Sequence, residues 1–246
     1  MFKSSDHEWN QYGAENPYYG VISDEKMYNK NLTEETLLEF WRTGQEYVDA
    51  MFQNIGRHIC PTFSPNQALD FGCGVGRLLF ALSAKCSHVT GIDVSSSMLA
   101  EAKCQADKKG IANIAFVESS DCSEIGENLF DLVHSFIVLQ HIPVDRGYAI
   151  MDKLLASLRP GGIGVLHLTF SNPGYKKWKL TRMIPFNKQL RNMRNRKPLN
   201  TPAMQMNEYD LNKTMKKIMD IGVKSCFIEC TNHDEIQGVK LYFQKR

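Results

Sequence analysis

The sequence predicts an α/β fold in which a mostly parallel sheet carries helices on both faces. From residue 67 onward, apolar runs of strand length alternate with segments of helical character, as in βαβ units. Three glycines follow the first run at alternate positions, which indicates a tight turn at the carboxyl edge of the sheet. The last two strand-like runs are joined by a short connection, which predicts an antiparallel hairpin at one edge.

The segment before the sheet divides into two parts. The first thirty residues are aromatic and polar and show no clear periodicity. Thr33 then has the character of a helix N-cap, because two glutamates follow it in the first turn. Apolar residues recur at near-helical spacing from there to about Gly56. We therefore expect residues 1–60 to form an aromatic and helical cap segment in front of a domain at 61–246.

Within that domain, strands and helices are expected in regular succession. Ser95 is expected to cap a helix that runs to residue 109, with Gly110 as its stop. Asn207 is expected to cap a helix that runs to residue 221. Two further helices are expected at 76–85 and 149–158. The predicted strands are 67–71, 88–93, 114–118, 130–136, 163–170, 224–230 and 238–244.

Length, charge and cysteine content exclude several classes of protein. The 246 residues are enough for one sizeable core, and a net charge of +2 does not favour nucleic-acid binding driven by bulk charge. The sequence contains no uncharged apolar stretch long enough to span a membrane, and the N-terminus lacks the apolar segment of a secretory signal. Seven scattered cysteines include no CxxC pair, so no metal is expected. We expect a cytoplasmic protein with reduced thiols that neither binds nucleic acid nor inserts stably into a membrane.

The stretch ALDFGCGVGRL, at residues 68–78, discriminates between ligand classes. Gly72, Gly74 and Gly76 are spaced G-x-G-x-G, and Arg77 stands where a dinucleotide-binding turn has its third glycine. No Gly-Lys-Ser/Thr follows, which excludes a P-loop. The turn therefore favours close approach of a ligand to its tip over a pyrophosphate above a helix N-terminus.

Two acids accompany this turn. Asp93 ends the second predicted strand, in VTGIDVSSSML, where a carboxylate can accept hydrogen bonds from two ribose hydroxyls. Asp70 lies on the first predicted strand. Ligands of open α/β sheets bind at the carboxyl edge, where the second strand ends.

Five stretches together resemble the successive motifs of the class I S-adenosylmethionine-dependent methyltransferases. They are ALDFGCGVGRL, GIDVSSSML, the loop ESSD, FDLVHSFIVLQHIP and LRPGGIGVLHL, in that order. The resemblance covers residues 67–170 well and the closing hairpin less sharply. It implies a Rossmann-like class I methyltransferase fold, with a seven-stranded, mostly parallel sheet whose last strand is antiparallel. It also implies S-adenosyl-L-methionine as the cofactor.

The resemblance carries cofactor contacts over residue by residue. Asp70 matches the acid that orients the amino end of the cofactor, and Asp93 matches the acid that binds its ribose. Ser120 and Asp121 stand where the family contacts adenine, although Ser-Asp replaces a common Asp-Ala pair. The expected cofactor-binding residues are Asp70, Gly72, Cys73, Gly74, Asp93, Val94, Ser120, Asp121, Ser135 and Phe136.

His141, in VLQHIP, is the candidate catalytic residue. It follows the fourth predicted strand, where related enzymes often have a residue that faces the methyl acceptor. An imidazole there could remove a proton from the acceptor near neutral pH. The alternative is that His141 only binds backbone groups of the turn that follows it. The expected substrate contacts are Tyr12, Tyr19, Gln140 and Tyr175.

The leading functional hypothesis is methyl transfer to an oxygen or nitrogen of a small-molecule acceptor. A second hypothesis keeps the cofactor but releases methylthioadenosine by intramolecular cyclisation, and a third is a binding module without turnover. A basic insert at 171–207 holds nine Lys or Arg and no acid. It is either a solvated face, or a lid or surface for an anionic substrate or membrane. The sequence gives no indication of oligomeric state.

Overall fold

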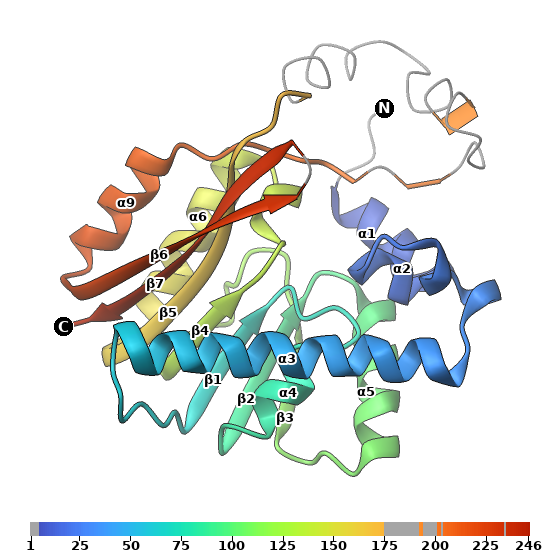
Figure 1. Ribbon diagram of the computed structural model, residues 1–246, viewed down its shortest axis with the longest axis horizontal. Coiled ribbons are helices and arrows are strands. Elements are labelled where there is room, and N and C mark those ends of the chain that lie inside the picture. Colours follow the sequence, from blue (N-terminus) through green and yellow to red (C-terminus); the bar gives the residue numbers. More distant parts are fainter. Residues whose placement is uncertain (1–4, 175–191, 194–200, 203, 234) are drawn as a thin grey trace.

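The centre of the molecule is one seven-stranded sheet. The computed structural model describes residues 5–174, 192–193, 201–202, 204–233 and 235–246. The strands are β1 (Gln67–Phe71), β2 (His88–Asp93), β3 (Ile114–Glu118), β4 (Phe130–Ser135), β5 (Leu158–Ser171), β6 (Val223–His233) and β7 (Ile236–Lys245). Their order across the sheet is β3-β2-β1-β4-β5-β7-β6 (Figure 1).

The strand directions confirm the predicted fold class. β1 pairs in parallel with β2 and β4, and the pairs β2–β3 and β4–β5 are also parallel. β7 lies antiparallel between β5 and β6, so the expected closing hairpin is present. β5 begins at Leu158 instead of residue 163, so the Pro-Gly-Gly segment between the predicted helix and the predicted strand belongs to the strand. Its pairing with β4 shifts register between Phe130 and Leu132.

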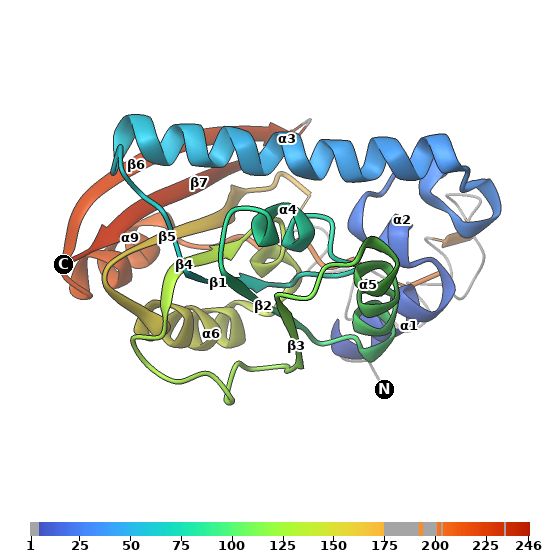
Figure 2. The same cartoon turned by 90° about the horizontal axis from the view of Figure 1, so that it is seen from below.

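Helices cover both faces of this sheet (Figures 1 and 2). They are α3 (Glu34–His58), α4 (Leu79–Ser83) and α5 (Ser96–Lys109) on one face, and α6 (Val144–Ser157) and α9 (Leu211–Asp220) on the other. One apolar core, which includes Leu69 and Phe243, lies under α6 and α9, and a second, which includes Ala68 and Tyr242, lies under the first set. Successive residues of one strand thus serve opposite cores. Within the described residues, no helix combines the length and apolar character that crossing a bilayer requires.

α3 runs along the sheet and begins as predicted. The Thr33 hydroxyl accepts a hydrogen bond from the Thr36 N–H at 3.2 Å, and the Thr33 N–H donates to the Thr36 hydroxyl at 2.8 Å. This reciprocal pair is a capping box. The buried residues of α3 recur at every third or fourth position and form one stripe along the helix: Phe40, Gly44, Val48, Met51 and Ile55.

Two other helices differ from the prediction. The sequence predicts a helix over 76–85, but α4 is shorter because Gly76 has a φ of 92°, which no right-handed helix accommodates. α6 begins at Val144 instead of residue 149 and ends at Ser157. It starts directly after Pro143, where the missing proline N–H costs nothing because the first helical N–H groups have no intrahelical acceptor.

The last helix is capped by Asp210 and not by Asn207. The Asp210 carboxylate accepts a hydrogen bond from the Lys213 N–H at 3.0 Å. The Asn207 amide donates instead to the carbonyls of Gln140 and Ile142, at 3.0 and 2.9 Å. The segment before α9 is therefore tied to the loop that follows β4.

The N-terminal residues form two helices that the sequence does not predict. They are α1 (Ser5–Glu15) and α2 (Pro17–Val21), which short 3₁₀ turns at Glu25–Met27 and Asn29–Asn31 connect to α3. A third apolar core joins them to α3, to α5 and to the glycine turn. Its members are Tyr12, Tyr18, Tyr19, Met27, Phe40, Val75 and Met98. The two helices stand beside α5 in both views (Figures 1 and 2).

Candidate active site

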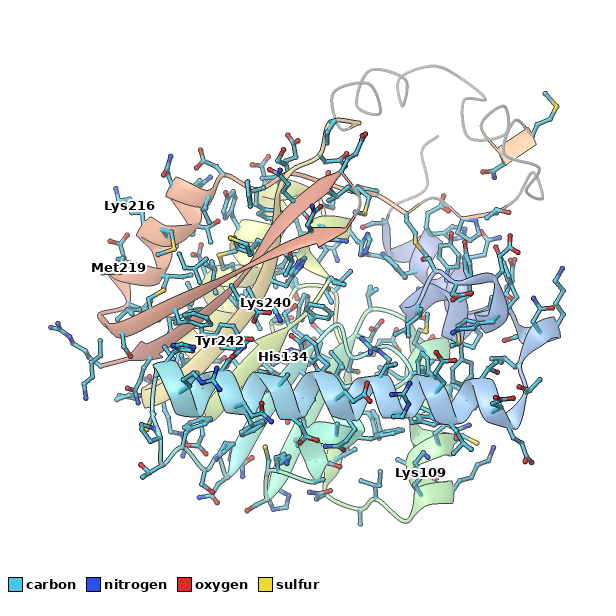
Figure 3. All side chains as sticks on the ribbon, viewed as in Figure 1. Lys109, His134, Lys216, Met219, Lys240 and Tyr242 are labelled. Atoms are coloured by element: carbon cyan, nitrogen blue, oxygen red, sulfur yellow. The ribbon has the colours of Figure 1, made fainter. Side chains whose placement is uncertain are left out.

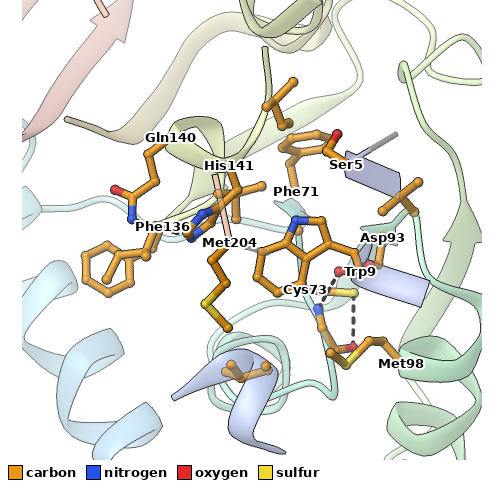
Figure 4. A pocket seen from close by; sticks show the side chains of 18 of the residues that line it. Ser5, Trp9, Phe71, Cys73, Asp93, Met98, Phe136, Gln140, His141 and Met204 are labelled. Atoms are coloured by element: carbon orange, nitrogen blue, oxygen red, sulfur yellow. Dashed lines mark hydrogen bonds between the residues drawn. The ribbon is translucent and has the colours of Figure 1, made fainter. Parts of the chain in front are cut away.

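A cavity of about 430 Å³ lies between the carboxyl edge of the parallel strands and the two N-terminal helices. Its lining comes from the turn after β1, the end of β2, the loops after β3 and β4, and both α1 and α2 (Figure 4). β1 has β2 on one side and β4 on the other, so the chain leaves β1 and β4 in opposite directions along the sheet. Ligands of open α/β sheets bind at such a switch point.

Asp93 lies at the carboxyl end of β2 and lines the cavity. One carboxylate oxygen accepts a hydrogen bond from the Gly74 N–H at 2.8 Å, and the other accepts from the Ser95 N–H at 2.9 Å. Burial raises the pKa of Asp93 to about 6, against the lowering effect of these backbone hydrogen bonds. Each oxygen retains a lone pair for a hydroxyl group of a ligand.

The glycine turn needs its glycines for conformation and for space. Gly72 and Gly74 have φ angles of 77° and 53°, in the left-handed region that favours glycine. A Cβ atom on Gly72 would lie 2.2 Å from a methyl carbon of Val138. Val138 follows Ile137, a β-branched residue with a φ of 58°, which is costly by roughly 1–2 kcal/mol. The loop after β4 is thus held strained against the turn after β1, and both line the cavity.

Asp70 and His134 form a buried pair beside the turn. They are neighbours in register on β1 and β4, and a carboxylate oxygen of Asp70 lies 2.8 Å from His134 Nδ1. His134 Nε2 lies 3.1 Å from the hydroxyl of Tyr47 on α3. Figure 3 shows His134 next to that helix. Because a carboxylate only accepts, Nδ1 donates to Asp70 and Nε2 accepts from Tyr47.

The loop after β3 contributes one of the two residues expected at adenine. Ser120 lines the cavity, and its carbonyl accepts a hydrogen bond from Arg146 at 2.6 Å. Asp121 is not part of the lining. Its carboxylate accepts from the Ser123 N–H at 3.0 Å and lies 3.5 Å from the Lys153 ammonium group. The hydrogen bonds of Ser123 hold the pKa of Asp121 below its ordinary value.

His141 and Gln140 line another part of the cavity. His141 Nδ1 lies 2.6 Å from the Gln205 carbonyl, so Nδ1 carries the proton and Nε2 is the acceptor nitrogen. The Gln140 amide nitrogen lies 3.4 Å from Nε2, and the Gln140 amide oxygen accepts from the Thr169 hydroxyl at 2.7 Å. Burial lowers the pKa of His141 to about 4, although the Gln205 hydrogen bond raises it. The imidazole is therefore neutral at physiological pH.

Trp9 of α1 lines the cavity and contacts His141. Its ring lies edge-on to that of His141, with centroids 5.0 Å apart, and Figure 4 shows the two close together above Met204. Tyr12 and Tyr19, which the sequence predicts as substrate contacts, are not part of the lining. The Tyr12 hydroxyl donates to the Pro202 carbonyl at 2.8 Å, and the Tyr19 ring stacks on Tyr28 at 4.0 Å.

The structure gathers most of the predicted site residues in this one cavity. They are Asp70, Gly72, Cys73, Gly74, Asp93, Val94, Ser120, Phe136, Gln140 and His141. Ser135 is not among the lining residues, because its hydroxyl is turned to the Phe71 carbonyl at 3.1 Å. Tyr175 and most of the basic insert lie outside the described residues.

Several lining residues were not predicted. They are Ser5, Asp6, Trp9, Val21, Ile22, Arg77, Met98, Ser119, Ile137, Val138, Arg146, Met204 and Met206. Arg77 directly follows the third glycine, so its position in the motif is the signal that could have found it. The residues of α1 carry no comparable signal, because that segment lacks a helical pattern of apolar residues.

Comparison with known proteins agrees with this geometry. Residues 68–162 match a family described as "Methyltransferase domain". A ubiquinone biosynthesis O-methyltransferase of Bradyrhizobium diazoefficiens is 37% identical over 103 residues, which are 41% of this chain and 38% of that protein. One of Psychrobacter arcticus is 32% identical over 112 residues, which are 44% and 42% of the two chains. The chain thus matches about two fifths of the length of these relatives.

Two solved structures share the fold over nearly the whole chain. Magnesium protoporphyrin IX methyltransferase from Synechocystis PCC 6803 with bound SAH has a TM-score of 0.66 at 19% identity and covers 98% of both chains. The N-methyltransferase NodS from Bradyrhizobium japonicum in complex with S-adenosyl-l-homocysteine has a TM-score of 0.63 at 13% identity and covers 99% of both.

The fold, the glycine turn and the acid at the end of β2 define the class I S-adenosylmethionine-dependent methyltransferases. This chain has the fold of that class, and its residues 68–162 match a methyltransferase domain.

Proposed function

We propose that the chain transfers a methyl group from S-adenosyl-L-methionine to an oxygen or nitrogen of a small-molecule acceptor. One observation carries this proposal: the groups suited to the cofactor and a neutral imidazole line the same cavity. Asp93 and the glycine turn line one part of it, and His141 lines another. A donor and an acceptor can therefore meet without leaving the enclosed space.

The residues at the carboxyl edge of β1 and β2 suit the cofactor. Asp93 offers one lone pair on each oxygen to the ribose hydroxyls, and Gly72 and Gly74 leave the backbone open to close approach. When bound, the cofactor supplies a methyl group activated by its sulfonium. The chain then has to align the acceptor and exclude water. α1, which forms one wall of the cavity, contributes to both tasks.

His141 is suited to receive a proton from the acceptor. The Gln205 carbonyl fixes the proton on Nδ1, which leaves Nε2 as the basic atom of this lining residue. A pKa of about 4 keeps this nitrogen unprotonated across the physiological range. Such a weak base accepts a hydrogen bond from the acceptor O–H or N–H and takes the proton as methyl transfer makes that group acidic.

The lining supports a small and largely apolar acceptor. Trp9, Phe136 and Met204 provide apolar surface near His141, and the Gln140 amide adds one polar contact. The matched relatives are named for ubiquinone biosynthesis, and one structural neighbour is named for magnesium protoporphyrin IX. Both names refer to small molecules, which supports the same class of acceptor here.

Product analysis tests the reaction. The purified chain is incubated with S-adenosyl-L-methionine alone and then with a metabolite extract, and the products are identified by mass spectrometry. We expect S-adenosylhomocysteine only when extract is present. One compound of the extract should then gain about 14 mass units, because methyl transfer replaces a hydrogen with a methyl group. Methylthioadenosine above the spontaneous background without extract would instead support intramolecular cyclisation of the cofactor.

The role of His141 is tested by the substitution His141→Asn. The asparagine amide can still donate to the Gln205 carbonyl, but it offers no basic nitrogen. We expect turnover to fall by about 10²- to 10⁴-fold with the acceptor identified above, while the affinity for S-adenosylhomocysteine changes little. Full turnover in His141→Asn would show that the residue only anchors the segment around Gln205.

Two further assignments belong to the same proposal. We infer that residues 1–60 act as a cap segment on the domain at 61–246, because α1 and α2 supply part of the cavity lining. We also infer that the protein works in the cytoplasm, where its seven cysteines stay reduced. All seven are free thiols in the structure.

A further inference from the structure

The short 3₁₀ turn that carries His141 is held by the side chain of Asn207. The turn spans Leu139–His141 and follows β4. The Asn207 amide nitrogen donates to the carbonyls of Gln140 and Ile142 at 3.0 and 2.9 Å, and the Asn207 backbone N–H donates to Gln140 at 2.7 Å. Asn207 is buried, so these hydrogen bonds replace water for the amide and for both carbonyls. The backbone on either side of His141 is therefore fixed.

A second side chain, that of Tyr209, contacts the same turn. Its hydroxyl oxygen lies 2.9 Å from the carbonyl oxygen of Leu139 and 3.2 Å from that of Ile142, and the two carbonyls share its hydrogen. The fold leaves room for this hydroxyl, because a Cβ atom on Gly147 of α6 would lie 1.8 Å from its oxygen. Glycine within a helix is less favourable than alanine by roughly 1 kcal/mol. The space for the Tyr209 hydroxyl is thus kept at a cost in helix stability.

The same stretch of chain, residues 205–209, also reaches the imidazole ring. The Gln205 carbonyl accepts the Nδ1 proton of His141 at 2.6 Å. The Tyr209 N–H donates to the carbonyl of Thr169 on β5 at 2.8 Å, which joins the stretch to the sheet. The position of the Gln205 carbonyl relative to the ring therefore depends on the side chains that anchor this stretch to the turn.

We propose that Asn207 and Tyr209 are positioning residues for His141. They keep the Gln205 carbonyl against Nδ1 of the ring, so that Nε2 stays free of a proton. This inference rests on the proposed function, in which His141 receives the proton that the acceptor oxygen or nitrogen loses as its bond to the methyl group forms. A carbonyl at one imidazole nitrogen fixes the tautomer. Once Nε2 has taken the proton, the ring is an imidazolium, and the same carbonyl accepts a stronger, charge-assisted hydrogen bond.

Two tyrosines of one core provide a matched pair of variants. Tyr209→Phe removes the hydroxyl that holds the turn. Tyr148→Phe is the control, because Tyr148 is buried, its ring centroid lies 5.3 Å from that of Tyr209, and its hydroxyl donates to the Asp210 carbonyl at 3.1 Å. Asn207→Asp is a second test variant, which keeps the size of the side chain but replaces the amide donor with an acceptor. Melting temperatures report whether each variant is folded.

Nuclear magnetic resonance reads the tautomer without any turnover. Protein with isotope-labelled histidine is measured with S-adenosylhomocysteine at neutral pH, where the imidazole of His141 is neutral. The signals of His141 are identified by their loss in His141→Asn, and the shifts of the ring nitrogens show which one is protonated. We expect the proton on Nδ1 in wild-type protein and in Tyr148→Phe. In Tyr209→Phe and Asn207→Asp, part of the population should carry it on Nε2.

Kinetics with the acceptor found by product analysis links the tautomer to the reaction. We expect kcat to fall about 10-fold in Tyr209→Phe and Asn207→Asp, as for the loss of one hydrogen bond. The KM for S-adenosyl-L-methionine should stay within about twofold, because the cofactor contacts are untouched. Tyr148→Phe should keep the wild-type kcat. An unshifted tautomer in the two test variants, or an equal fall of kcat in Tyr148→Phe, would overturn the positioning role.

Two outcomes separate the positioning role from the proposed function. Slow turnover in His141→Asn, together with wild-type turnover and an unshifted tautomer in Tyr209→Phe, would overturn the positioning role and leave His141 as the base. Wild-type turnover in both variants, despite a shifted tautomer in Tyr209→Phe, would overturn the base of the proposed function and the positioning role with it.

Discussion

Two effects oppose each other in setting the pKa of the Asp93 carboxyl group. Two backbone N–H groups hold its oxygens, yet burial raises its pKa to about 6. Because this value lies above the ordinary aspartate pKa of about 3.9, protonation favours the folded state. Without ligand, the contribution of Asp93 to the free energy of unfolding therefore grows as the pH falls through about 6. The ribose site requires the opposite, ionised form.

Cofactor affinity should consequently depend on pH. We expect the affinity for S-adenosylhomocysteine to be nearly constant above about pH 7 and to fall below pH 6, as Asp93 becomes protonated and loses an acceptor. Titration calorimetry from about pH 5 to pH 8 extends at least one pH unit to either side of this pKa and so covers the transition. Asp93→Asn should bind about 10- to 100-fold more weakly above pH 7 and lack the transition. A wild-type profile that stays flat across pH 6 would contradict the assignment.

Gly72 offers a test of the glycine turn with a control inside the chain. Gly72 and Gly110 both have positive φ angles, 77° and 66°, so alanine strains the backbone at both by roughly 1 kcal/mol. A Cβ atom at Gly110 meets nothing within 4 Å, whereas at Gly72 it overlaps Val138. We expect both alanine variants to melt at lower temperature, but only Gly72→Ala to lose affinity for S-adenosylhomocysteine. Equal affinities in calorimetry would show that the cavity tolerates a side chain at Gly72.

Individual residues were predictable where a short motif fixes their geometry. The glycines and Asp93 lie together because consecutive residues of β1 and β2 bring them there, and the sequence shows both strands. The same reasoning selects Tyr12 as a substrate contact, but Trp9, which is also on α1, lines the cavity and Tyr12 does not. Only the packing of α1 against α5 decides that Trp9 lines the cavity and Tyr12 turns to Pro202. Long-range contacts of this kind leave no local pattern.

Among the elements, α1 closes the cavity through a small number of polar contacts. Arg146 lies 2.7 Å from the Asp6 carboxylate and also donates to the Ser120 carbonyl. Trp9 adds its ring contact with His141. The ion pair is partly exposed, so its contribution to stability is small, about 0.2–1 kcal/mol.

Asp6→Asn should loosen this helix. It removes the ion pair with Arg146 but leaves the hydrogen bond to Ser120 in place. We expect the backbone amides of α1 to exchange hydrogen about two- to fivefold faster, with α3 unchanged. Hydrogen exchange read by mass spectrometry measures this, with Glu46→Gln on the exposed side of α3 as control. Unchanged exchange in Asp6→Asn would mean that apolar contacts alone hold α1.

Strands were easier to predict than helix ends. β1, β2 and β3 coincide with the prediction, because short apolar runs bounded by polar residues have defined ends. Asn207 and Asp210 are both good N-caps, and the sequence shows no reason to prefer one. The choice depends on carbonyls at Gln140 and Ile142, which occupy the Asn207 amide. The contact between Asn207 and Gln140 joins residues 67 positions apart in the sequence. A long-range contact thus decides where α9 begins.

At the scale of the whole molecule, topology accounts for most of what was predictable. Alternating strands and helices predict the parallel sheet, and the switch point between β1 and β4 predicts where the cavity lies. The walls of that cavity were less predictable. They come from α1, α2 and the segment around Met204, which belong to no strand-and-helix repeat and reach the cavity through tertiary packing. The lining residues of the glycine turn and of the end of β2 therefore follow from the fold, whereas Trp9 and Met204 come from segments added to it.

The position of β7 has a consequence for the order in which the chain can assemble. β6 is made before β7, yet it reaches the sheet only through β7, which pairs with β5 on its other side. Until β7 has been synthesised, β6 has no strand of the sheet to pair with, and the edge of β5 stays open. Val239, Leu241 and Phe243 of β7 then complete one core, and Tyr242 completes the other. β7 thus completes the sheet by joining β6 to β5, and a nascent chain released before residue 236 would expose the unpaired edge of β5 to neighbouring chains.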